Sequence, residues 1–551
     1  MMKRINSNKK LRLLFIILQF LLIPSACMAH SSRSGWKSRE VNWRMNGRNR
    51  IKSISYPAEK RPPFLKDHTT TSVRVEKRQL PQHAVRRIEE LQQEVVETTV
   101  MVNVVNSPPV AGLVPWVALG ITDAHGDIYE MDAAVSPVVT GDFLTPSPES
   151  NYAIAIFDTG ASSNLINYSD AAITGLYASD MVTSSPVVLQ GASGRSVTAY
   201  ASFPLGLFAD GLDAIEPNGL VDPSGMRGET NVSLIVGDQF ESPLVPTVIG
   251  APFAIFYNVA FCNNKAVSVN IAGQDVNSPH IDFYEPSDPC VPYYDNKIYM
   301  NLRPSDLIGV QYFPCIEPLF ICPDGDGSPL IPTIIVDAWW LHQGLFFLDS
   351  VDVSDGVKSA IDKDAFMFDS GAQVSVISEA IAARLQLDID NPEFTVEILD
   401  VTGDVSINPG FYLDSLEIVS SPEWLSYNNV PVIVLDIEFP GVGFIDGIIG
   451  TNLLVDFNFT FHGGGLPGTG APYLRYEPVC DLPGDIAGDC YECQVDYLDL
   501  ADFVEAWLGS SSGPSENWNF QADLAPQSEP DGEINFLDFA VLAQHWLEGT
   551  Y

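Results

Sequence analysis

The sequence predicts a mainly β protein with an internal repeat, followed by a small α-helical module at the C-terminus. Between residues 101 and 478, short runs of β-branched and aromatic residues are separated by Gly, Pro, Asn and Asp, which is typical of strands joined by turns. Two copies of one β motif lie within this region. From residue 479 onward, two acidic loops are each followed by a short apolar stretch with helical spacing.

The amino-acid composition excludes some classes of function. The chain has 551 residues, with 29 Lys and Arg against 70 Asp and Glu, a net charge of −41. Such a balance argues against a nucleic-acid partner, because binding phosphates requires a basic surface. The charge is uneven: residues 1–100 hold 20 basic and 8 acidic side chains, and residues 101–551 hold 9 and 62. A basic head therefore precedes an acidic body.

The first residues read as a secretory signal. Basic residues precede an apolar run at 13–23, and small residues around Ala26 to Ala29 follow it. This pattern predicts a signal peptide over residues 1–29, cleaved after Ala29. The run is short for a membrane span, and no later segment reaches 18 uninterrupted apolar residues. We therefore expect a soluble mature protein without a membrane span, secreted to the extracellular space or cell surface, with the periplasm as an alternative.

Seven cysteines remain after removal of the signal. They are Cys262, Cys290, Cys315, Cys322, Cys480, Cys490 and Cys493. An oxidising compartment favours disulfides among them, and the odd number leaves at least one thiol free or intermolecular. Zinc binding is the rival interpretation for Cys490 and Cys493, but no second pair or His stands at suitable spacing.

The basic head has two parts. Residues 30–80 are polar, contain Pro57, Pro62 and Pro63, and lack a sustained apolar period, so we expect flexible chain there. Residues 82–98 show helical spacing of apolar side chains. Over residues 30–100 the net charge is +7, which favours attraction to the acidic body near neutral pH. We hypothesise an inhibitory propeptide; a flexible basic tail is the alternative.

The repeat within the β-rich region carries the candidate chemistry. Residues 157–161 read Phe-Asp-Thr-Gly-Ala and residues 368–372 read Phe-Asp-Ser-Gly-Ala. Downstream, residues 248–250 and 448–450 repeat an apolar-apolar-Gly segment. If the copies pack around a pseudo-twofold axis, Asp158 and Asp369 meet. Two carboxyl groups in contact cannot both ionise, so they share a proton and can activate a water for peptide hydrolysis.

These motifs resemble those of aspartic proteases of the pepsin and retropepsin superfamily, over roughly residues 102–478. The resemblance implies a bilobal acid-protease fold with pseudo-twofold symmetry, with an N-terminal lobe at 101–261, a Cys-containing connection at 262–330 and a C-terminal lobe at 331–478. It also implies the site residues. They are the dyad Asp158 and Asp369, the bracing hydroxyls of Thr159 and Ser370, and the turn glycines Gly160 and Gly371. A structural alternative is a repeated β module whose Asp only caps a turn.

The same resemblance requires a hairpin that closes over the substrate. The candidates are residues 187–194 leading into 197–203, and residues 396–399 returning through 405–407. Each is equally well an ordinary hairpin. No tyrosine stands at the expected flap position, since Tyr200 lies past the turn.

The C-terminal segment, residues 479–551, resembles a type I dockerin-like module, whose loops bind calcium. Two approximate repeats, at 496–503 and 535–542, each follow a loop rich in Asp and Gly. The family positions map onto Asp523, Asp531, Asn535 and Asp538 in the second loop, and onto Asp485, Asp489, Asp496 and Asp499 in the first. Both loops depart from the pattern by insertions. An unmetallated helical pair is the alternative to Ca²⁺.

Together these features predict a secreted aspartic endopeptidase that acts on a protein or peptide substrate, without a catalytic cofactor. The tail would tether it to a cohesin-like or cell-surface partner. The competing hypothesis is an inactive protease-fold protein that serves in surface assembly. Serine or metal hydrolases lack support, because His125, His280, His342 and His462 are scattered and stand in no recognisable catalytic motif.

Overall fold

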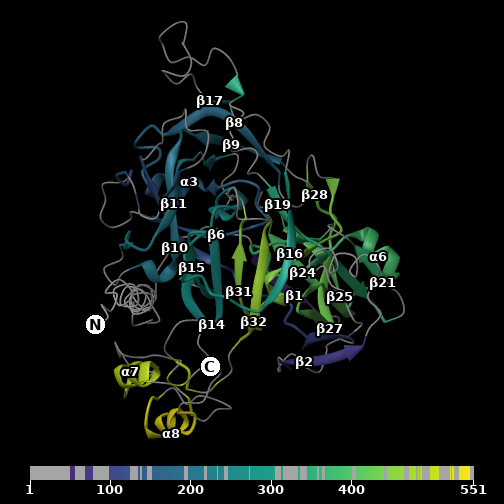
Figure 1. Cartoon of the computed structure of the whole chain (residues 1–551). Coiled ribbons are helices and arrows are strands. Elements are labelled where there is room, and N and C mark those ends of the chain that lie inside the picture. The colour runs from purple at the N-terminus through teal and green to yellow at the C-terminus, as the bar shows by residue number, and fades with distance from the viewer. Residues whose placement is uncertain are drawn as a thin grey trace, which may run out of the picture. The chain divides into compact units, whose positions relative to one another are not determined.

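The computed structural model is mainly β (Figure 1). It describes residues 50–55, 69–77, 99–123, 134–136, 139, 141–144, 152–190, 196–215, 220–232, 234–240, 246–271, 274–304, 312–313, 333–334, 344–356, 359–362, 366–399, 405–439, 443–464, 471–479, 482, 484–486, 495, 497–507, 522, 524–525 and 533–546. The described residues fall into two compact units, which divide between Val479 and Cys480.

The first half of the larger unit is built on a ten-stranded sheet. In spatial order its strands are β5 (Ala134–Ser136), β11 (Arg227–Val232), β10 (Leu205–Gly211), β4 (Trp116–Thr122), β6 (Tyr152–Phe157), β13 (Val248–Ile249), β7 (Leu165–Ile166), β12 (Ile235–Gly237), β9 (Ser196–Ser202) and β8 (Val182–Gln190). The side chains of β4 and β6 are buried throughout, as expected for central strands with continuous apolar sequence.

The remaining strands of this unit form mainly one branched, eighteen-stranded sheet. They are β1 (Arg50–Ser55), β2 (Thr69–Lys77), β3 (Thr99–Asn106), β14 (Asn258–Ile271), β15 (Gln274–Tyr284), β16 (Asn296–Pro304), β19 (Gly344–Leu348), β20 (Val351–Ser354), β21 (Ser359–Asp362), β22 (Phe366–Phe368), β23 (Val376–Ile377), β24 (Phe394–Leu399), β25 (Val405–Ile418), β26 (Ser420–Ser421), β27 (Glu423–Val434), β30 (Gly447–Ile449), β31 (Phe457–His462) and β32 (Tyr473–Pro478). Two short pairs stand apart: β17 (Tyr312–Phe313) with β18 (Thr333–Ile334), and β28 (Glu438–Phe439) with β29 (Gly443–Phe444).

Among the described residues, short helices follow the repeated motifs, except for η1, which follows β10. They are α3 (Tyr168–Ile173), η1 (Leu212–Ala214), α4 (Ala251–Ala254), α6 (Glu379–Leu385) and η2 (Thr451–Leu453). Asn167 caps the start of α3 and Ser378 that of α6, each through a side-chain oxygen that accepts a backbone N–H. Gln386 ends α6 in the left-handed conformation, with φ of 61°.

The two sequence repeats adopt matched strand pairings. In the first, β6 runs parallel to β13, which places Ile249 beside Phe157. In the second, β22 runs parallel to β30, which places Ile449 beside Phe368. The predicted downstream segments therefore lie next to the strands that end at the two aspartates.

The two halves join through β14 and β31, which pair antiparallel with Ala260 opposite Thr460. Stacked aromatic rings fill the core at this junction. Phe261 and Phe459 stack with ring centroids 4.3 Å apart, and Phe157 and Phe368 contact these rings from the two motif strands. A single hydrophobic cluster spans both halves, so the strands that carry the aspartates rest on common packing.

The expectation of flexible chain over residues 30–80 is wrong for two ranges. Strand β1 pairs with β24, and β2 pairs with β3. The sequence of β2, Thr-Thr-Thr-Ser-Val-Arg-Val-Glu-Lys, is rich in β-branched residues, and β3 offers an edge for it to pair with, which outweighs its polarity. Strand β3 also crosses the expected boundary at residue 100. The helix predicted for residues 82–98 lies outside the described residues.

Two further observations on the described residues concern membrane spans and cysteines. No helix among these residues combines the length and the apolar character needed to cross a bilayer. Of the seven cysteines, Cys262 and Cys290 are described, and neither carries a free thiol.

The smaller unit contains α7 (Tyr497–Ala506) and α8 (Phe536–Gln544). Buried side chains from both repeats form its core, among them Val495, Phe503, Ile534 and Leu542. Val495 and Ile534 are equivalent positions of the two predicted repeats, as are Phe503 and Leu542. One helix thus lies at each of the two sequence repeats.

Candidate active site

Asp158 and Asp369 stand at equivalent places, directly after the buried strands β6 and β22. The backbone N–H of Asp158 donates to Ile249 O at 2.8 Å, and that of Asp369 donates to Ile449 O at 3.1 Å. The two side chains meet and hydrogen-bond with each other. The structure thus brings together two carboxyl groups that are 211 positions apart in the sequence.

Each carboxyl group is held by its own turn. Asp158 Oδ1 accepts the N–H groups of Gly160 and Ala161 at 2.8 and 3.0 Å. Asp369 Oδ1 accepts those of Gly371 and Ala372 at 2.8 and 3.2 Å. These bonds fix one oxygen of each aspartate within its own turn.

Thr159 and Ser370 tie the two turns together. The Thr159 N–H donates to Ser370 Oγ at 3.1 Å, and the Ser370 N–H donates to Thr159 Oγ1 at 3.0 Å. Each hydroxyl also donates across to the other strand: Thr159 Oγ1 to Phe368 O at 3.1 Å and Ser370 Oγ to Phe157 O at 2.7 Å. Both side chains are fully buried, so four reciprocal bonds lock the spacing of the dyad away from water.

The turn glycines lie against the opposite aspartates. A Cβ built on Gly160 would stand 2.4 Å from Asp369 Cγ, and one on Gly371 would stand 2.4 Å from Asp158 Cγ. No side chain fits at these distances. Glycine is therefore required here by close approach, and neither residue has a positive φ.

The pair titrates as a coupled unit. Burial raises the pKa of Asp158 well above its ordinary value, and the adjacent Asp369 carboxylate raises it further. Burial also raises the pKa of Asp369, while the hydrogen bond from Asp158 lowers it. Both residues keep partial access to solvent. The arrangement favours one proton shared by the pair, so that one carboxyl group is protonated while the other is ionised.

Two residues that hold the downstream glycine segments in place were not predicted from the sequence. Asn164 Oδ1 accepts the N–H of Gly250 at 2.8 Å, and Ser375 Oγ accepts the N–H of Gly450 at 3.0 Å. Each stands six positions after its aspartate, so the equal offset within the repeat was the signal that could have identified them. They fasten the downstream glycine segments to the turns that hold the dyad.

Asp170 was also missed. It is buried at the start of α3, where its carboxylate accepts hydrogen bonds from Thr247 Oγ1 and Asn167 Nδ2. Burial raises its pKa to about 6, against the lowering effect of these two bonds. The side chain belongs to the support of the first motif and does not contact the dyad through any bond among the described residues.

Both predicted hairpins exist. Strands β8 and β9 pair up to Gln190 opposite Ser196, and β24 and β25 pair up to Leu399 opposite Val405. The turns themselves, residues 191–195 and 400–404, lie outside the described residues. Strand β1 pairs with the other edge of β24, so the second hairpin carries an additional strand from the basic head.

In the tail, four predicted calcium ligands (Asp489, Asp496, Asp523 and Asp531) lie outside the described residues. Asp499 is buried, and its Oδ1 accepts the N–H of Ile486 at 2.7 Å. Asp485 lies in the described part of the same loop. Asn535 caps α8, its Oδ1 accepting the N–H of Leu537.

Asp538 accepts backbone hydrogen bonds through both of its carboxyl oxygens. Its Oδ1 accepts the N–H groups of Leu524 and Ala525, and its Oδ2 accepts that of Asn535, each at 2.7 Å. A carboxylate offers about four acceptor positions, so three are taken by the backbone. A bidentate contact with calcium would have to displace these bonds. The donor set at Asp538 therefore does not fit that role.

Comparison with known proteins gives one family match. Residues 358–453 match a family model described as aspartyl protease, and this range contains Asp369, Ser370, Gly371 and Gly450. No curated protein matches the chain. Among solved structures, the basic 7S globulin from soybean shares 9% identity with a TM-score of 0.27, over 66% of this chain and 95% of that one. A likeness at this level supports no argument about function.

Proposed function

We propose that this protein is an aspartic endopeptidase, because a segment that matches the aspartyl protease family meets a second copy of its own motif at a shared pair of carboxyl groups. The observation that carries the proposal is the contact between Asp158 and Asp369, together with the reciprocal bonds of Thr159 and Ser370. An Asp that only caps a turn would need no second carboxyl group beside it. It would also need no following hydroxyl that hydrogen-bonds to the other motif.

The chemistry follows from the shared proton. A water held between the carboxyl groups loses a proton to the ionised member of the pair as its oxygen attacks the peptide carbonyl carbon. The protonated member of the pair donates a hydrogen bond to the carbonyl oxygen, where negative charge develops. Proton transfer to the amide nitrogen then releases the amine product. Asp158 and Asp369 return to one shared proton, and no covalent intermediate forms.

The proposed architecture is two lobes around a local twofold axis. In its support, Ala260 and Thr460 face each other across β14 and β31, at positions that the sequence repeat makes equivalent. The hairpins β8–β9 and β24–β25 are the proposed flaps. Val188 and Ile407, on these hairpins, are each 66% exposed, which suits strands that close on an extended peptide.

The basic head is proposed to inhibit the enzyme until it is removed. Strand β1 lies along the edge of β24, one strand of a proposed flap. Addition of a strand there would restrict flap movement, and the charge contrast with the acidic body would hold it in place near neutral pH. A chain that starts at Thr99, where β3 begins, should be more active than one that starts at His30. Equal activities would contradict the inhibitory role.

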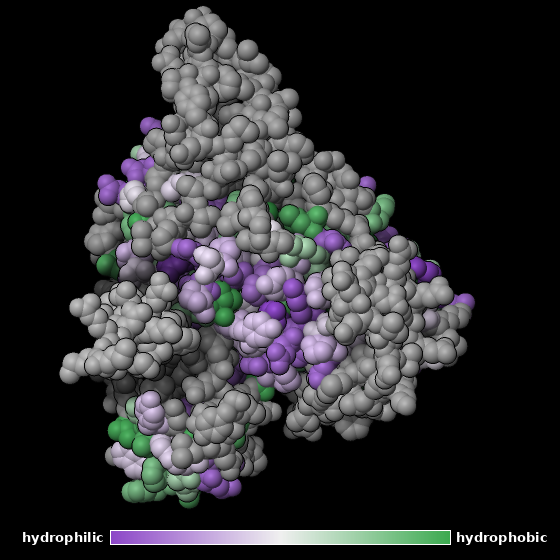
Figure 2. Space-filling model, viewed as in Figure 1, coloured by the Kyte–Doolittle hydropathy of each residue, from purple (hydrophilic) through white to green (hydrophobic). Residues whose placement is uncertain are grey.

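The tail is proposed to tether the enzyme outside the cell, with calcium as a ligand of its loops and a cohesin-like or cell-surface protein as its partner. Figure 2 shows hydrophobic residues gathered on this helical unit. Tyr497 and Val504 of α7 and Phe536 and Leu537 of α8 are each between 59% and 75% exposed. Such apolar side chains on a small unit suit a protein partner. Secretion through the predicted signal peptide, and disulfides among the cysteines, belong to the same proposal.

The central test is pepstatin-sensitive cleavage of a denatured protein across pH 3–7. The wild type should cleave, and Asp158→Asn and Asp369→Asn should each lose activity by several orders of magnitude while remaining folded. Asp390→Asn, a substitution at an exposed aspartate outside both motifs, is the matched control and should retain full activity. A folded wild type without activity at any pH would instead support the inactive surface-assembly protein.

A further inference from the structure

A second group of chemically active side chains lies outside the proposed active site. It consists of Asp213, His280 and Asp282, each of which can place one ligand atom within 4.8 Å of the ligand atoms of the other two. All three are half-buried. In the sequence, His280 stands in no recognisable catalytic motif. Asp213 is 67 positions away from it, so only the fold brings the two residues together.

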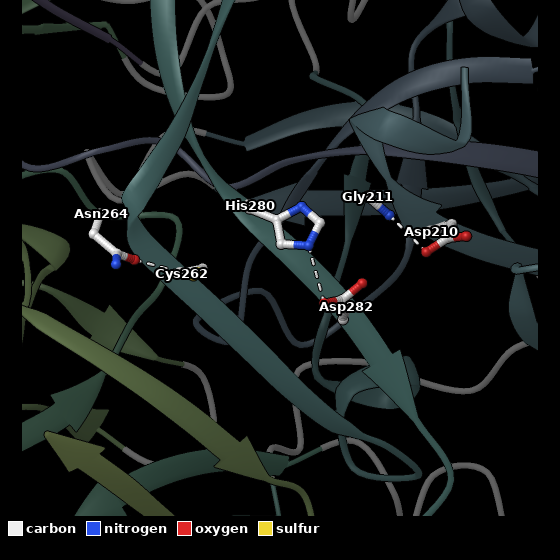
Figure 3. Close-up of polar contacts among 6 residues, drawn as sticks. All are labelled: Asp210, Gly211, Cys262, Asn264, His280 and Asp282. Atoms are coloured by element: carbon white, nitrogen blue, oxygen red, sulfur yellow. Dashed lines mark hydrogen bonds and ion pairs between the residues drawn. The ribbon is translucent and has the colours of Figure 1, made fainter. Parts of the chain in front are cut away.

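The geometry of strand β15 creates half of this group. His280 and Asp282 are two positions apart on β15, so their side chains emerge on the same face. Their contact is direct, with His280 Nε2 and Asp282 Oδ2 3.0 Å apart (Figure 3). Their cross-strand neighbours on β14 are Cys262 and Ala260. Ala260 is small, and Cys262 has no free thiol that would compete as a ligand.

The other half comes from the end of β10. The chain leaves β10 at Gly211 and enters η1, which carries Asp213. A Cβ on Gly211 would stand 2.2 Å from Ile281 O and 2.7 Å from Asp213 Oδ1. Glycine therefore lets η1 approach the backbone of β15 closely enough to bring Asp213 to His280. Because β10 belongs to the ten-stranded sheet and β15 to the eighteen-stranded one, the group joins the two sheets.

Carboxyl groups from three elements act on the imidazole. Three carboxyl groups, those of Asp282, Asp213 and Asp210, act electrostatically on His280, in this order of strength. Figure 3 shows Asp210 and Gly211 on the segment beside His280 and Asp282. Carboxylate oxygens this close to an imidazole nitrogen form a negatively charged donor set, which attracts a cation.

We propose that Asp213, His280 and Asp282 bind a divalent transition-metal ion, with zinc as the best match. One imidazole nitrogen and two carboxylate oxygens form a donor set that zinc accepts, with water at the fourth position. The hard ions Ca²⁺ and Mg²⁺ prefer oxygen donors alone. The ion crosslinks η1 to β15 and thereby stabilises the junction between the two sheets. It takes no part in peptide hydrolysis.

The test is a zinc titration of the full chain by isothermal calorimetry, in excess Ca²⁺ so that carboxylate loops in the tail are occupied. The variants are His280→Gln and Asp213→Asn, with Asp390→Asn as the matched control. The wild type and the control should share one binding event that both site variants lose or weaken by at least about 100-fold. Zinc bound at Cys490 and Cys493 would give the same binding signal in all four proteins, so it cannot account for a difference between them.

Thermal unfolding gives a second readout. Zinc should raise the melting temperature of the wild type and of Asp390→Asn, because it binds the folded state only. If either His280→Gln or Asp213→Asn fails to fold, Asp282→Asn replaces it, since that side chain is the more exposed of the ion pair at 32%. Equal zinc affinity in the wild type and the folded site variants would overturn the proposal, as would a wild type that binds no zinc.

Discussion

Gly160 lies directly against the carboxyl group of Asp369, so that a Cβ on this glycine would meet Asp369 Cγ at 2.4 Å. The contact crosses from the first motif to the second. Each glycine of the repeat therefore shapes the site of the opposite aspartate as well as its own turn. The fit of the two halves is set by backbone atoms that touch a carboxyl group.

We predict that Gly160→Ala lowers the catalytic rate about 100-fold, because the new methyl group must push the Asp369 carboxyl out of alignment. Gly371→Ala should have a similar effect through Asp158. Steady-state kinetics on a peptide substrate, with circular dichroism to verify folding, provide the measurement. Wild-type kinetics in both folded variants would show that the tight contact has no functional role.

Thr159→Val is predicted to destabilise the protein by about 2 to 4 kcal/mol. The substitution keeps the shape but leaves the buried Ser370 N–H and Phe368 O without the hydroxyl that now bonds to them. Thr159→Ser retains the hydroxyl and is the matched control. Chemical denaturation measures the difference. If Thr159→Val and Thr159→Ser lower the free energy of unfolding equally, the reciprocal bonds contribute little and the prediction is wrong.

We expect Glu229 to make the free energy of unfolding depend on pH. It is fully buried on β11, and neither carboxyl oxygen has a hydrogen-bond partner among the described residues. Burial raises its pKa well above the ordinary value of 4.5. A raised folded-state pKa gives stability that is complete below the unfolded-state pKa and is lost as pH rises toward the folded-state value. The loss is about 1.4 kcal/mol per pH unit within that window.

Glu229→Gln should therefore flatten the decline in unfolding free energy between pH 5 and pH 7. Asp170, whose pKa is raised to about 6, adds to the decline in both proteins over the window from 3.8 to 6. Glu438→Gln, at an exposed position of β28, is the control and should follow the wild type. Urea denaturation at several pH values measures the slopes. Parallel slopes in all three proteins would exclude Glu229 as a source.

In the tail, Asp538→Asn is predicted to weaken the helical unit by about 2 kcal/mol, because the amide removes one of the two charged oxygens that accept three backbone N–H groups. Hydrogen exchange of Leu524, Ala525 and Asn535 should accelerate. Glu533→Gln, exposed at the end of the same loop, is the control.

A calcium chelator distinguishes a loop that is ordered by hydrogen bonds to Asp538 from one that is ordered by a bound calcium ion. If Asp538 closes it through backbone bonds, exchange at Leu524 and Ala525 stays slow without calcium. Fast exchange in chelator that calcium reverses would show that the metal, and not these bonds, orders the loop.

The repeat in the sequence was sufficient to locate the motif aspartates, the downstream glycines and both hairpins, since each depends on local patterns that fold in the same way twice. It did not reveal Asn164 and Ser375, whose roles depend on backbone groups brought beside them by strand pairing. Strands β1 and β2 were missed because their residues are polar and basic, and a neighbouring strand edge decided their conformation.

The amino-acid order alone fixed which residue types stand at each turn, because Asp-Thr-Gly or Asp-Ser-Gly after an apolar strand needs no distant partner to form. Whether the two turns face each other was decided by the tertiary structure, through the common aromatic core beneath them. The same holds for His280 and Asp213: no spacing rule connects them, and they become neighbours only because two sheets pack with a glycine at the point of contact.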